Sequence, residues 1–195
     1  GAAAGELSSV QHDFTTRREG TAVTIRNLNH AFQPKSVVVI GASGKPGSLG
    51  APVLKNIIDG GFGGDIWPVN PRYQELAGRR CYASVKDIPE VPDLAVIMTP
   101  APTVPGLVSE LGEKGTRAAV VITAGITKAN GLRQKMLDAA KPHLLRIIGP
   151  NGIGLMLPPH KLNAGFFHMP AKPGDIALLS QSGAIATSLV DWAVE

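Results

Sequence analysis

The stretch VVVIGASGKPGSLGAPVLKNIIDGG, residues 37–61, decides the fold and raises the question of what its glycines hold. The four residues at its start are apolar, which is typical of a short strand buried on both faces of a sheet. Residues 49–59 place apolar side chains on one side of a predicted helix, and two glycines then end that helix. The loop between strand and helix carries glycine at positions 41, 44 and 47, and a fourth follows at 50.

The same alternation of strand and helix continues along the chain. Further strands are predicted at 65–69, 94–98, 118–123 and 145–148, and further helices at 104–114 and 132–140. Every connection is long enough for a crossover between parallel strands. The pattern therefore predicts an α/β fold with a Rossmann-like doubly wound parallel sheet.

Composition divides the chain into four parts. Residues 1–32 are expected to be a polar arm of partly artificial origin, and residues 33–150 form the predicted sheet domain. Residues 151–173 are rich in Pro and Gly and are interpreted as a linker. Residues 174–195 contain a predicted strand at 175–179 and a helix after it. One strand and one helix cannot bury a core, so this part is expected to be the truncated start of a second α/β domain.

Charge and composition argue against several classes of protein. The net charge is +4, but the cations are scattered and only 5% of residues are aromatic, so no nucleic-acid surface is expected. No apolar run reaches the roughly 20 residues of a membrane span, which predicts a cytoplasmic protein without membrane contact. Cys81 is the single cysteine and is expected to be structural. The five histidines show no metal-ligand spacing, so no metal site is predicted.

The glycine loop matches neither of two common phosphate-binding templates. A P-loop would need a different glycine spacing and a hydroxyl residue where Pro46 stands. The dinucleotide fingerprint fails because Ser43 occupies the place of its second glycine. The remaining pattern, G-x-x-G-x-x-G before a helix, can still present backbone N–H groups to a phosphate. A simple tight turn stays open as the alternative.

The end of the second predicted strand narrows the choice of cofactor. NAD-binding domains place an acidic residue there, whereas this chain has Arg72. A cation at this point favours a phosphorylated ribose, which means NADP or coenzyme A. An ordinary surface role for Arg72 remains the alternative. The other loops at the strand ends contain small, hydroxyl, Pro and Gly residues and no carboxylate, which suits cofactor binding better than acid-base catalysis.

Five motifs occur in order along the chain: KSVVVIGAS at 35–43, PVNP at 68–71, TAGI at 123–126, IGPN at 148–151 and LSQSG at 179–183. Together they resemble the CoA-binding domain of the NDP-forming acyl-CoA synthetases, the group that includes the succinyl-CoA synthetase α subunit. The segments at 162–167 and 189–193 look most like the single-chain ADP-forming acetate-CoA ligases. They are also similar to protein lysine acetyltransferases that fuse an inactive copy of that ligase to a GNAT domain.

The resemblance implies a site for CoA or acetyl-CoA along these loops, with the phosphates on the glycine loop, the adenosine near 70–72 and the pantetheine along the later loops. The implied cofactor-binding residues are Gly41, Ala42, Ser43, Gly44, Lys45, Gly47, Val69, Asn70, Arg72, Thr99, Pro100, Thr123, Ala124, Gly125 and Asn151. In the family a second, flavodoxin-like domain begins near 174, and the turn at Ser182 and Gly183 would bind the phosphate of a phosphohistidine.

That phosphohistidine is expected beyond residue 195, and ADP or ATP with Mg²⁺ would bind only through further synthetase domains of the same chain. The fragment alone should therefore bind CoA or an acyl-CoA without turnover, and homo-oligomer formation is compatible with the sequence. Two alternatives stay open. One is an NADP-binding oxidoreductase domain, and the other is a CoA-sensing module without catalysis.

Overall fold

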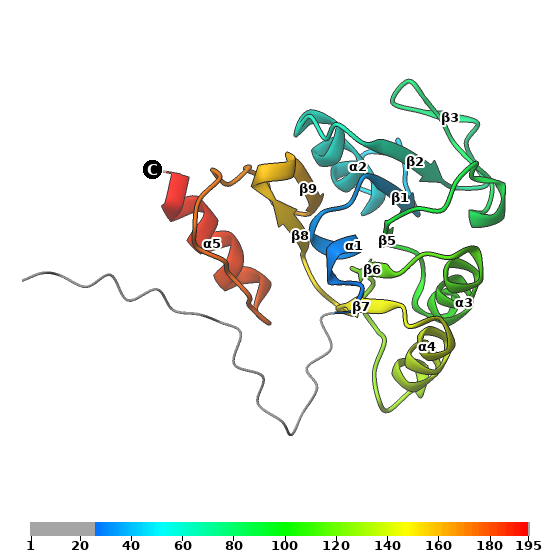
Figure 1. Cartoon of the computed structure of the whole chain (residues 1–195). Helices are drawn as coiled ribbons and strands as arrows, with labels where there is room; N and C mark the ends of the chain where they lie inside the picture. Colours follow the sequence, from blue (N-terminus) through cyan, green and yellow to red (C-terminus); the bar gives the residue numbers. More distant parts are fainter. Residues whose placement is uncertain (1–25, 195) are drawn as a thin grey trace, which may run out of the picture.

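The computed structural model describes residues 26–194, and its centre is a sheet of five parallel strands (Figure 1). The strands are β1 (Ser36–Ile40), β2 (Asp65–Val69), β5 (Leu94–Ile97), β6 (Ala118–Val121) and β7 (Arg146–Ile148). They lie in the order β2-β1-β5-β6-β7, and each neighbouring pair is parallel. The predicted Rossmann-like sheet is confirmed.

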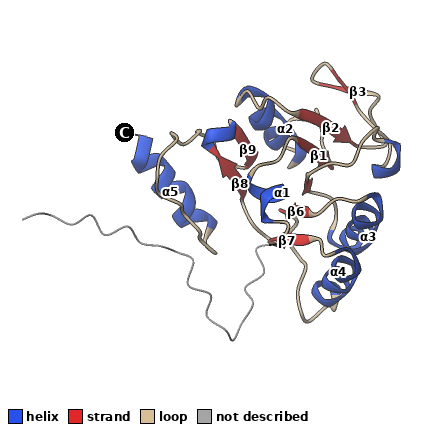
Figure 2. Cartoon of the chain, viewed as in Figure 1, coloured by secondary structure: helices blue, strands red, loops and turns tan. Residues whose placement is uncertain are grey.

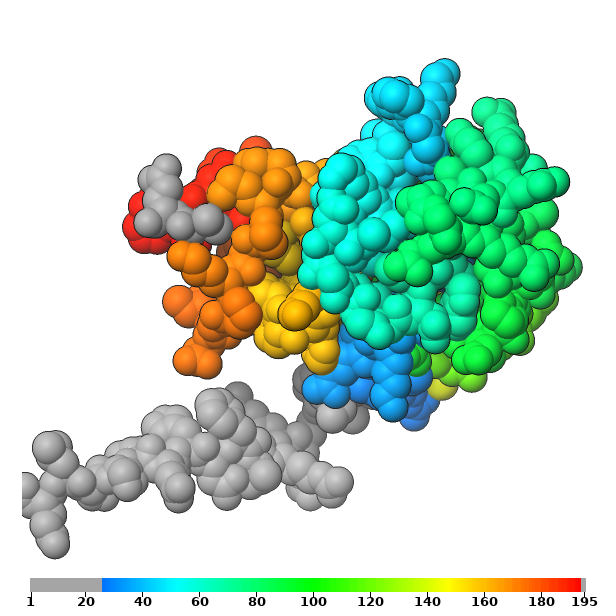
Figure 3. Space-filling model, turned by 90° about the horizontal axis from the view of Figure 1, so that it is seen from above, coloured from blue at the N-terminus to red at the C-terminus, as the bar shows by residue number. Residues whose placement is uncertain are grey.

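Helices cover both faces of this sheet (Figure 2). The helices are α1 (Leu28–Phe32), α2 (Gly50–Asp59), α3 (Val104–Lys114), α4 (Leu132–Ala140) and α5 (Gly183–Val194). The first two pack on one face of the sheet, and α3 and α4 pack on the other. The last helix, α5, stands to the side of the sheet (Figure 1), and the orange and red C-terminal part of the chain lies at one end of the space-filling view (Figure 3).

The sequence of β1 explains why two helical layers are needed. Successive side chains of a strand point to opposite faces of the sheet. Val37 and Val39 pack in the core under α2, whereas Val38 and Ile40 pack in the core under α3 and α4. All four side chains are at most 2% exposed. An uninterrupted apolar strand is therefore what a sheet covered on both faces requires.

The last residues of the predicted polar arm form a helix. Residues 1–25 of that prediction lie outside the described residues, but α1 forms within its last part. Ala31 in this helix is buried, and His30 Nδ1 lies 3.0 Å from Asp93 Oδ1, just before β5. The helix was not predicted because five residues are too few to show a helical period.

The predicted linker at 151–173 contains an antiparallel hairpin of β8 (Gly154–Leu157) and β9 (Leu162–Gly165). Leu162 and Ala164 are buried in the core with α2. The amide of Asn56 in α2 donates to the carbonyls of Gly165 and Phe167, each at 2.8 Å. The segment is thus a packed part of the sheet domain up to Phe167, and irregular only after it. The domain boundary itself stays a prediction.

The predicted strand at 175–179 is wrong. Residues 175–180 have no regular structure, and Ile176 and Leu179 are 95% and 97% exposed. A strand needs a neighbour that accepts its hydrogen bonds, and no strand among residues 26–194 pairs with this segment. The helix predicted after it is present as α5.

We expect Leu111→Ala in α3 to lower the free energy of unfolding by about 3 kcal/mol, because the leucine is fully buried and its removal leaves a cavity. The matched control is Leu137→Ala in α4, where the leucine is 44% exposed and the change should cost less than about 1 kcal/mol. Urea unfolding of the two variants makes the comparison. Similar losses in both would contradict the described core.

Candidate functional site

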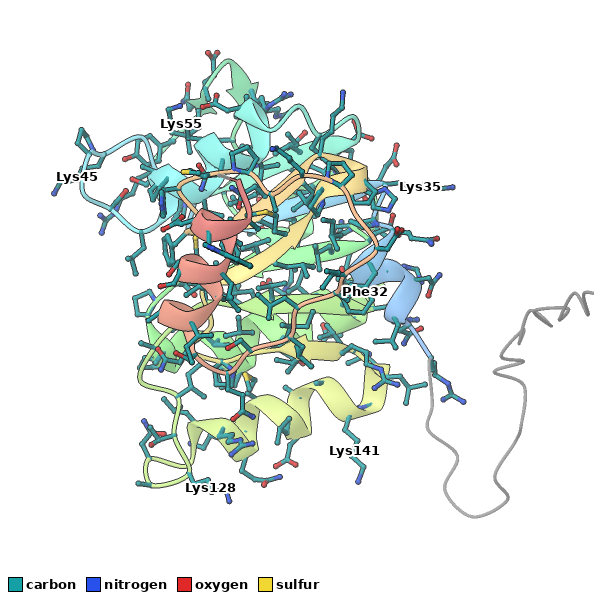
Figure 4. The ribbon with its side chains drawn as sticks, turned by 90° about the vertical axis from the view of Figure 1, so that its left-hand side faces the viewer. Phe32, Lys35, Lys45, Lys55, Lys128 and Lys141 are labelled. Atoms are coloured by element: carbon teal, nitrogen blue, oxygen red, sulfur yellow. The ribbon has the colours of Figure 1, made fainter. Side chains whose placement is uncertain are left out.

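The candidate site lies where the parallel strands end, at the edge of the sheet that carries the glycine loop. The strand order reverses between β1 and β5: the chain continues from β1 to β2 on one side and then crosses to β5 on the other. Ligands of such sheets bind outside the strand ends at this reversal. Figure 4 shows Lys45 and Lys128, from the loops after β1 and β6, at one edge of the molecule, with Lys35 before β1 at the opposite edge.

The glycine loop is shaped by close approaches of backbone. Gly41 has φ +88°, and a Cβ there would lie 3.1 Å from the carbonyl carbon and oxygen of Met98, at the end of β5. A Cβ on Gly50, the first residue of α2, would overlap the carbonyl oxygen of Gly41. Gly47 has φ +78°, a conformation that strains other residues. Three of the four glycines are therefore required by the geometry of the backbone.

Hydrogen bonds within the loop decide which of its amides are available. The Gly41 N–H donates to the Val69 carbonyl at 3.0 Å, and the Lys45 N–H donates to Ser43 Oγ at 3.0 Å. Within residues 26–194, the N–H groups of Ser43, Gly44 and Gly47 make no hydrogen bond. Together with the N-terminus of α2, these free donors can bind an anion.

The turn after β2 is held against the glycine loop by Asn70. Its side-chain amide donates to the Ala42 carbonyl at 2.8 Å, and its Oδ1 accepts the Arg72 N–H at 2.9 Å. The amide that was predicted to bind a cofactor is thus engaged in positioning two loops. Val69 is 4% exposed, so its predicted role cannot involve its side chain. The Arg72 side chain is exposed and has no hydrogen bond or ion pair among the described residues.

Threonine hydroxyls hold the ends of β5 and β6 together. Thr123 Oγ1 donates to the Thr99 carbonyl at 2.8 Å, and the Thr123 side chain is buried. Thr103 Oγ1 donates to Thr99 Oγ1 at 2.8 Å. The Asn151 N–H donates to the Thr123 carbonyl at 3.0 Å, which brings the loop after β7 to the same edge.

The remaining predicted residues of these loops, Pro100, Ala124 and Gly125, are exposed. They form an uncharged stretch of surface beside the glycine loop. The structure therefore brings the predicted residues of five loops to one edge of the sheet.

Ser182 and Gly183 belong to a different part of the molecule. They begin α5, where Ser182 Oγ accepts the Ile185 N–H at 3.4 Å. The Ser182 N–H donates to Ser180 Oγ at 3.0 Å and is not free. A Cβ on Gly183 would overlap the side chain of Ile153, just before β8. The contacts of Ser182 are within its own segment, Gly183 lies against Ile153, and none of these contacts involves the glycine loop.

Two side chains beside the glycine loop were not predicted. Tyr73 places its hydroxyl 3.3 Å from Ser43 Oγ. Leu76 lies next to Gly44, because a Cβ on that glycine would be 3.3 Å from Leu76 Cδ2. Leu76 belongs to a short hairpin of β3 (Glu75–Leu76) and β4 (Arg79–Arg80). The only signal in the sequence was the Ala77-Gly78 turn between them, and two-residue strands are too short to show a period.

The site contains cations, the Tyr73 hydroxyl and the Cys81 thiol. Burial raises the pKa of the Cys81 thiol. Among the described residues, no group of three or more His, Cys, Asp or Glu side chains could hold a metal ion. No helix of residues 26–194 combines the length and apolar character that a membrane span needs.

The two hollows described on the surface lie outside the glycine loop. Two surface hollows of about 540 and 620 Å³ lie outside α3 and beside the turn after β2. No residue of the glycine loop lines either of them.

Comparison with known proteins identifies the family. Residues 35–158 match the family described as "CoA binding domain". The chain belongs to the CoA-binding domain family. The match begins just before β1 and ends just after β8, so it contains the sheet and all the loops at its strand ends. The resemblance of the five motifs to a CoA-binding domain is thereby confirmed.

Individual relatives of this CoA-binding domain are longer proteins. It is 40% identical to the α subunit of acetate–CoA ligase (ADP-forming) I from Pyrococcus furiosus, over 86% of this chain and 38% of that protein. It is 42% identical to an ADP-forming acetate–CoA ligase from Methanocaldococcus jannaschii, over 85% of this chain and 24% of that protein. The chain thus spans well under half the length of these relatives.

A solved structure agrees in fold. Acetyl-coenzyme A synthetase 1 from Candidatus Korarchaeum cryptofilum, in complex with phosphate and ADP, matches with a TM-score of 0.80 and 36% sequence identity. The match covers 86% of this chain and 37% of that one. The CoA-binding domain therefore shares its fold with part of a synthetase chain.

We expect Gly50→Ala to lower the free energy of unfolding by about 1–3 kcal/mol, because the added methyl group would meet the Gly41 carbonyl. Helix propensity alone would favour alanine by about 1 kcal/mol, so the sign of the change tests the close approach. Urea denaturation measures it. Gly63→Ala is the control, since nothing lies near its Cβ position. An unchanged or stabilised Gly50→Ala would contradict the loop geometry.

We expect Cys81 to react slowly with a thiol reagent at pH 7, because it is buried and its raised pKa lowers the fraction of thiolate. The rate should rise with pH in the folded protein and should be much faster in denaturant. Absorbance of the released thiol-reagent anion follows the reaction. Equal rates for folded and unfolded protein at pH 7 would show that the thiol is accessible.

Proposed function

We propose that this domain binds CoA or acetyl-CoA along the strand ends, with the diphosphate on the glycine loop. The observation that carries the proposal is the set of free N–H groups at Ser43, Gly44 and Gly47 in front of α2. Backbone donors at a helix N-terminus bind phosphate without any need for a positively charged side chain. The family match supports CoA, and not NADP, as the phosphorylated cofactor.

Arg72 binds the 3′-phosphate at the adenosine end of CoA in this proposal. Its backbone is fixed by Asn70, while its side chain is exposed and unpaired among the described residues. A guanidinium pairs well with phosphate because it can donate two parallel hydrogen bonds. The Asn70 bond to the Ala42 carbonyl keeps this turn beside the glycine loop.

The pantetheine arm follows the loops after β5 and β6. Thr99 and Pro100 at one strand end, and Ala124 and Gly125 at the next, form an uncharged border. Thr123 fixes their relative position through its hydrogen bond to Thr99. Asn151 lies at the end of this path, since its N–H is bonded to the Thr123 carbonyl. An uncharged path suits an amide-containing arm better than it suits a second charged group.

The domain is part of an ADP-forming acyl-CoA synthetase in this proposal, as its relatives' names and lengths suggest. The second α/β domain begins near residue 174, and Ser182 and Gly183 receive the phosphate of a phosphohistidine located in that domain. The exposure of Ile176 and Leu179 is consistent with a segment that lacks its neighbouring strands. ADP, Mg²⁺ and turnover belong to the further domains, or to a related acetyltransferase that uses the same CoA-binding domain.

Calorimetric titration of the 195-residue chain with CoA, dephospho-CoA and NADPH tests the proposal. We expect CoA to bind and NADPH to bind much more weakly. In Arg72→Gln, the affinity for CoA should fall by about 10-fold, because one charge-assisted phosphate contact is lost. The affinity for dephospho-CoA, which lacks the 3′-phosphate, should change by less than about 2-fold in the same variant.

Lys35→Gln provides the control, because Lys35 is an exposed cation just before β1, at the edge of the molecule opposite to the strand ends (Figure 4). It should leave both affinities unchanged. Absence of binding by CoA and dephospho-CoA would overturn the proposed function, and a preference for NADPH would restore the oxidoreductase alternative.

A further inference from the structure

The β3–β4 hairpin presents two different faces. Ala77 and Gly78, with φ +51° and +71°, form its two-residue turn. The register pairs Leu76 with Arg79 and Glu75 with Arg80. Residues directly opposite each other in an antiparallel pair have their side chains on the same face. One face therefore carries Leu76 and Arg79, and the other carries Glu75 and Arg80.

The face with Leu76 and Arg79 is turned toward the glycine loop. Leu76 is 6% exposed and packs in one core cluster with Ala42. A Cβ atom on Gly44 would lie 3.3 Å from the Cδ2 atom of Leu76. Cys81, two residues after Arg79, belongs to the same cluster, as the alternation of side chains requires. Arg79 thus lies on the side of the hairpin that borders the proposed diphosphate site.

The guanidinium of Arg79 lacks a partner. Its Nε atom is buried and makes no hydrogen bond, and no ion pair of residues 26–194 includes it. The carboxylate of Glu75 is on the opposite face of the hairpin. A buried donor without a partner is unfavourable, and an arginine in that condition is suited to a bidentate anion. Arg80 differs, because its guanidinium lies 5.1 Å from the centre of the Tyr82 ring and stacks on it.

We propose that Arg79 binds the diphosphate of CoA from the side opposite to the backbone amides of the glycine loop. This inference rests on the proposed function, and it adds a residue that the strand-end loops do not contain. The amides of Ser43 and Gly44 hold one side of the diphosphate, and the planar guanidinium of Arg79 donates two hydrogen bonds to the other. Arg72 and Arg79 then bind different phosphates of the same cofactor.

Titration of Arg79→Gln and Arg80→Gln with CoA and with dephospho-CoA separates these roles. Both compounds contain the diphosphate, so Arg79→Gln should weaken both by the same factor of about 10. Arg80→Gln removes the same charge from the opposite face of the hairpin and should change either affinity by less than about 2-fold. Arg79→Lys keeps the charge but not the bidentate geometry and should give an intermediate loss.

Three outcomes would overturn the role of Arg79. These are unchanged affinities in Arg79→Gln, equal losses of affinity in Arg79→Gln and Arg80→Gln, and a loss of affinity for CoA alone, which would assign Arg79 to the 3′-phosphate.

Thermal denaturation of each variant without ligand shows whether a loss of affinity comes from misfolding. If Arg79→Gln does not fold, the affinities of Arg79→Lys decide. If the unmodified chain binds neither compound, the proposed function fails, and this inference with it. If it binds both and the Arg79 variants bind them with unchanged affinity, the inference alone fails.

Discussion

The end of β1 and the start of α2 meet without room for a side chain between them. The first residue of the helix, Gly50, lies against the carbonyl of Gly41, and Gly41 in turn lies against the end of β5. This contact brings the N-terminus of α2 close to the sheet edge and forces the intervening residues into an open loop. The free amides of that loop, and the anion site that we propose for them, depend on this close approach.

The long apolar segments were predictable because their pattern is set by the sheet itself. Strand 65–69 and helices 104–114 and 132–140 have the bounds that the sequence predicted. Each is buried along one or both faces, so periodicity alone identifies it. The strand at 175–179 has an equally apolar sequence but no neighbour, and a strand is stable only when another strand completes its hydrogen bonds. The β8–β9 hairpin was missed because its four-residue strands stand among prolines and glycines.

The site was predictable in position but not in the role of each residue. Parallel strands bring their ends to one edge, so the loops could be grouped from the sequence. The sequence could not show which polar side chains form hydrogen bonds to other loops of the protein. Asn70 and Thr123 have the residue types expected of ligand contacts, yet both join one loop to another. Arg79, by contrast, directly follows the Ala77-Gly78 turn in a segment without a periodic pattern, and only the hairpin register shows which face carries its side chain.

Helix α2 connects two regions that are far apart in the sequence. Its first residue closes the glycine loop, and the amide of Asn56 in its second turn donates to the carbonyls of Gly165 and Phe167, where the chain leaves the sheet domain. The helix therefore spans the distance between the strand ends and the point where the chain leaves the sheet domain. One ten-residue element both closes the glycine loop and anchors the segment that leads to α5.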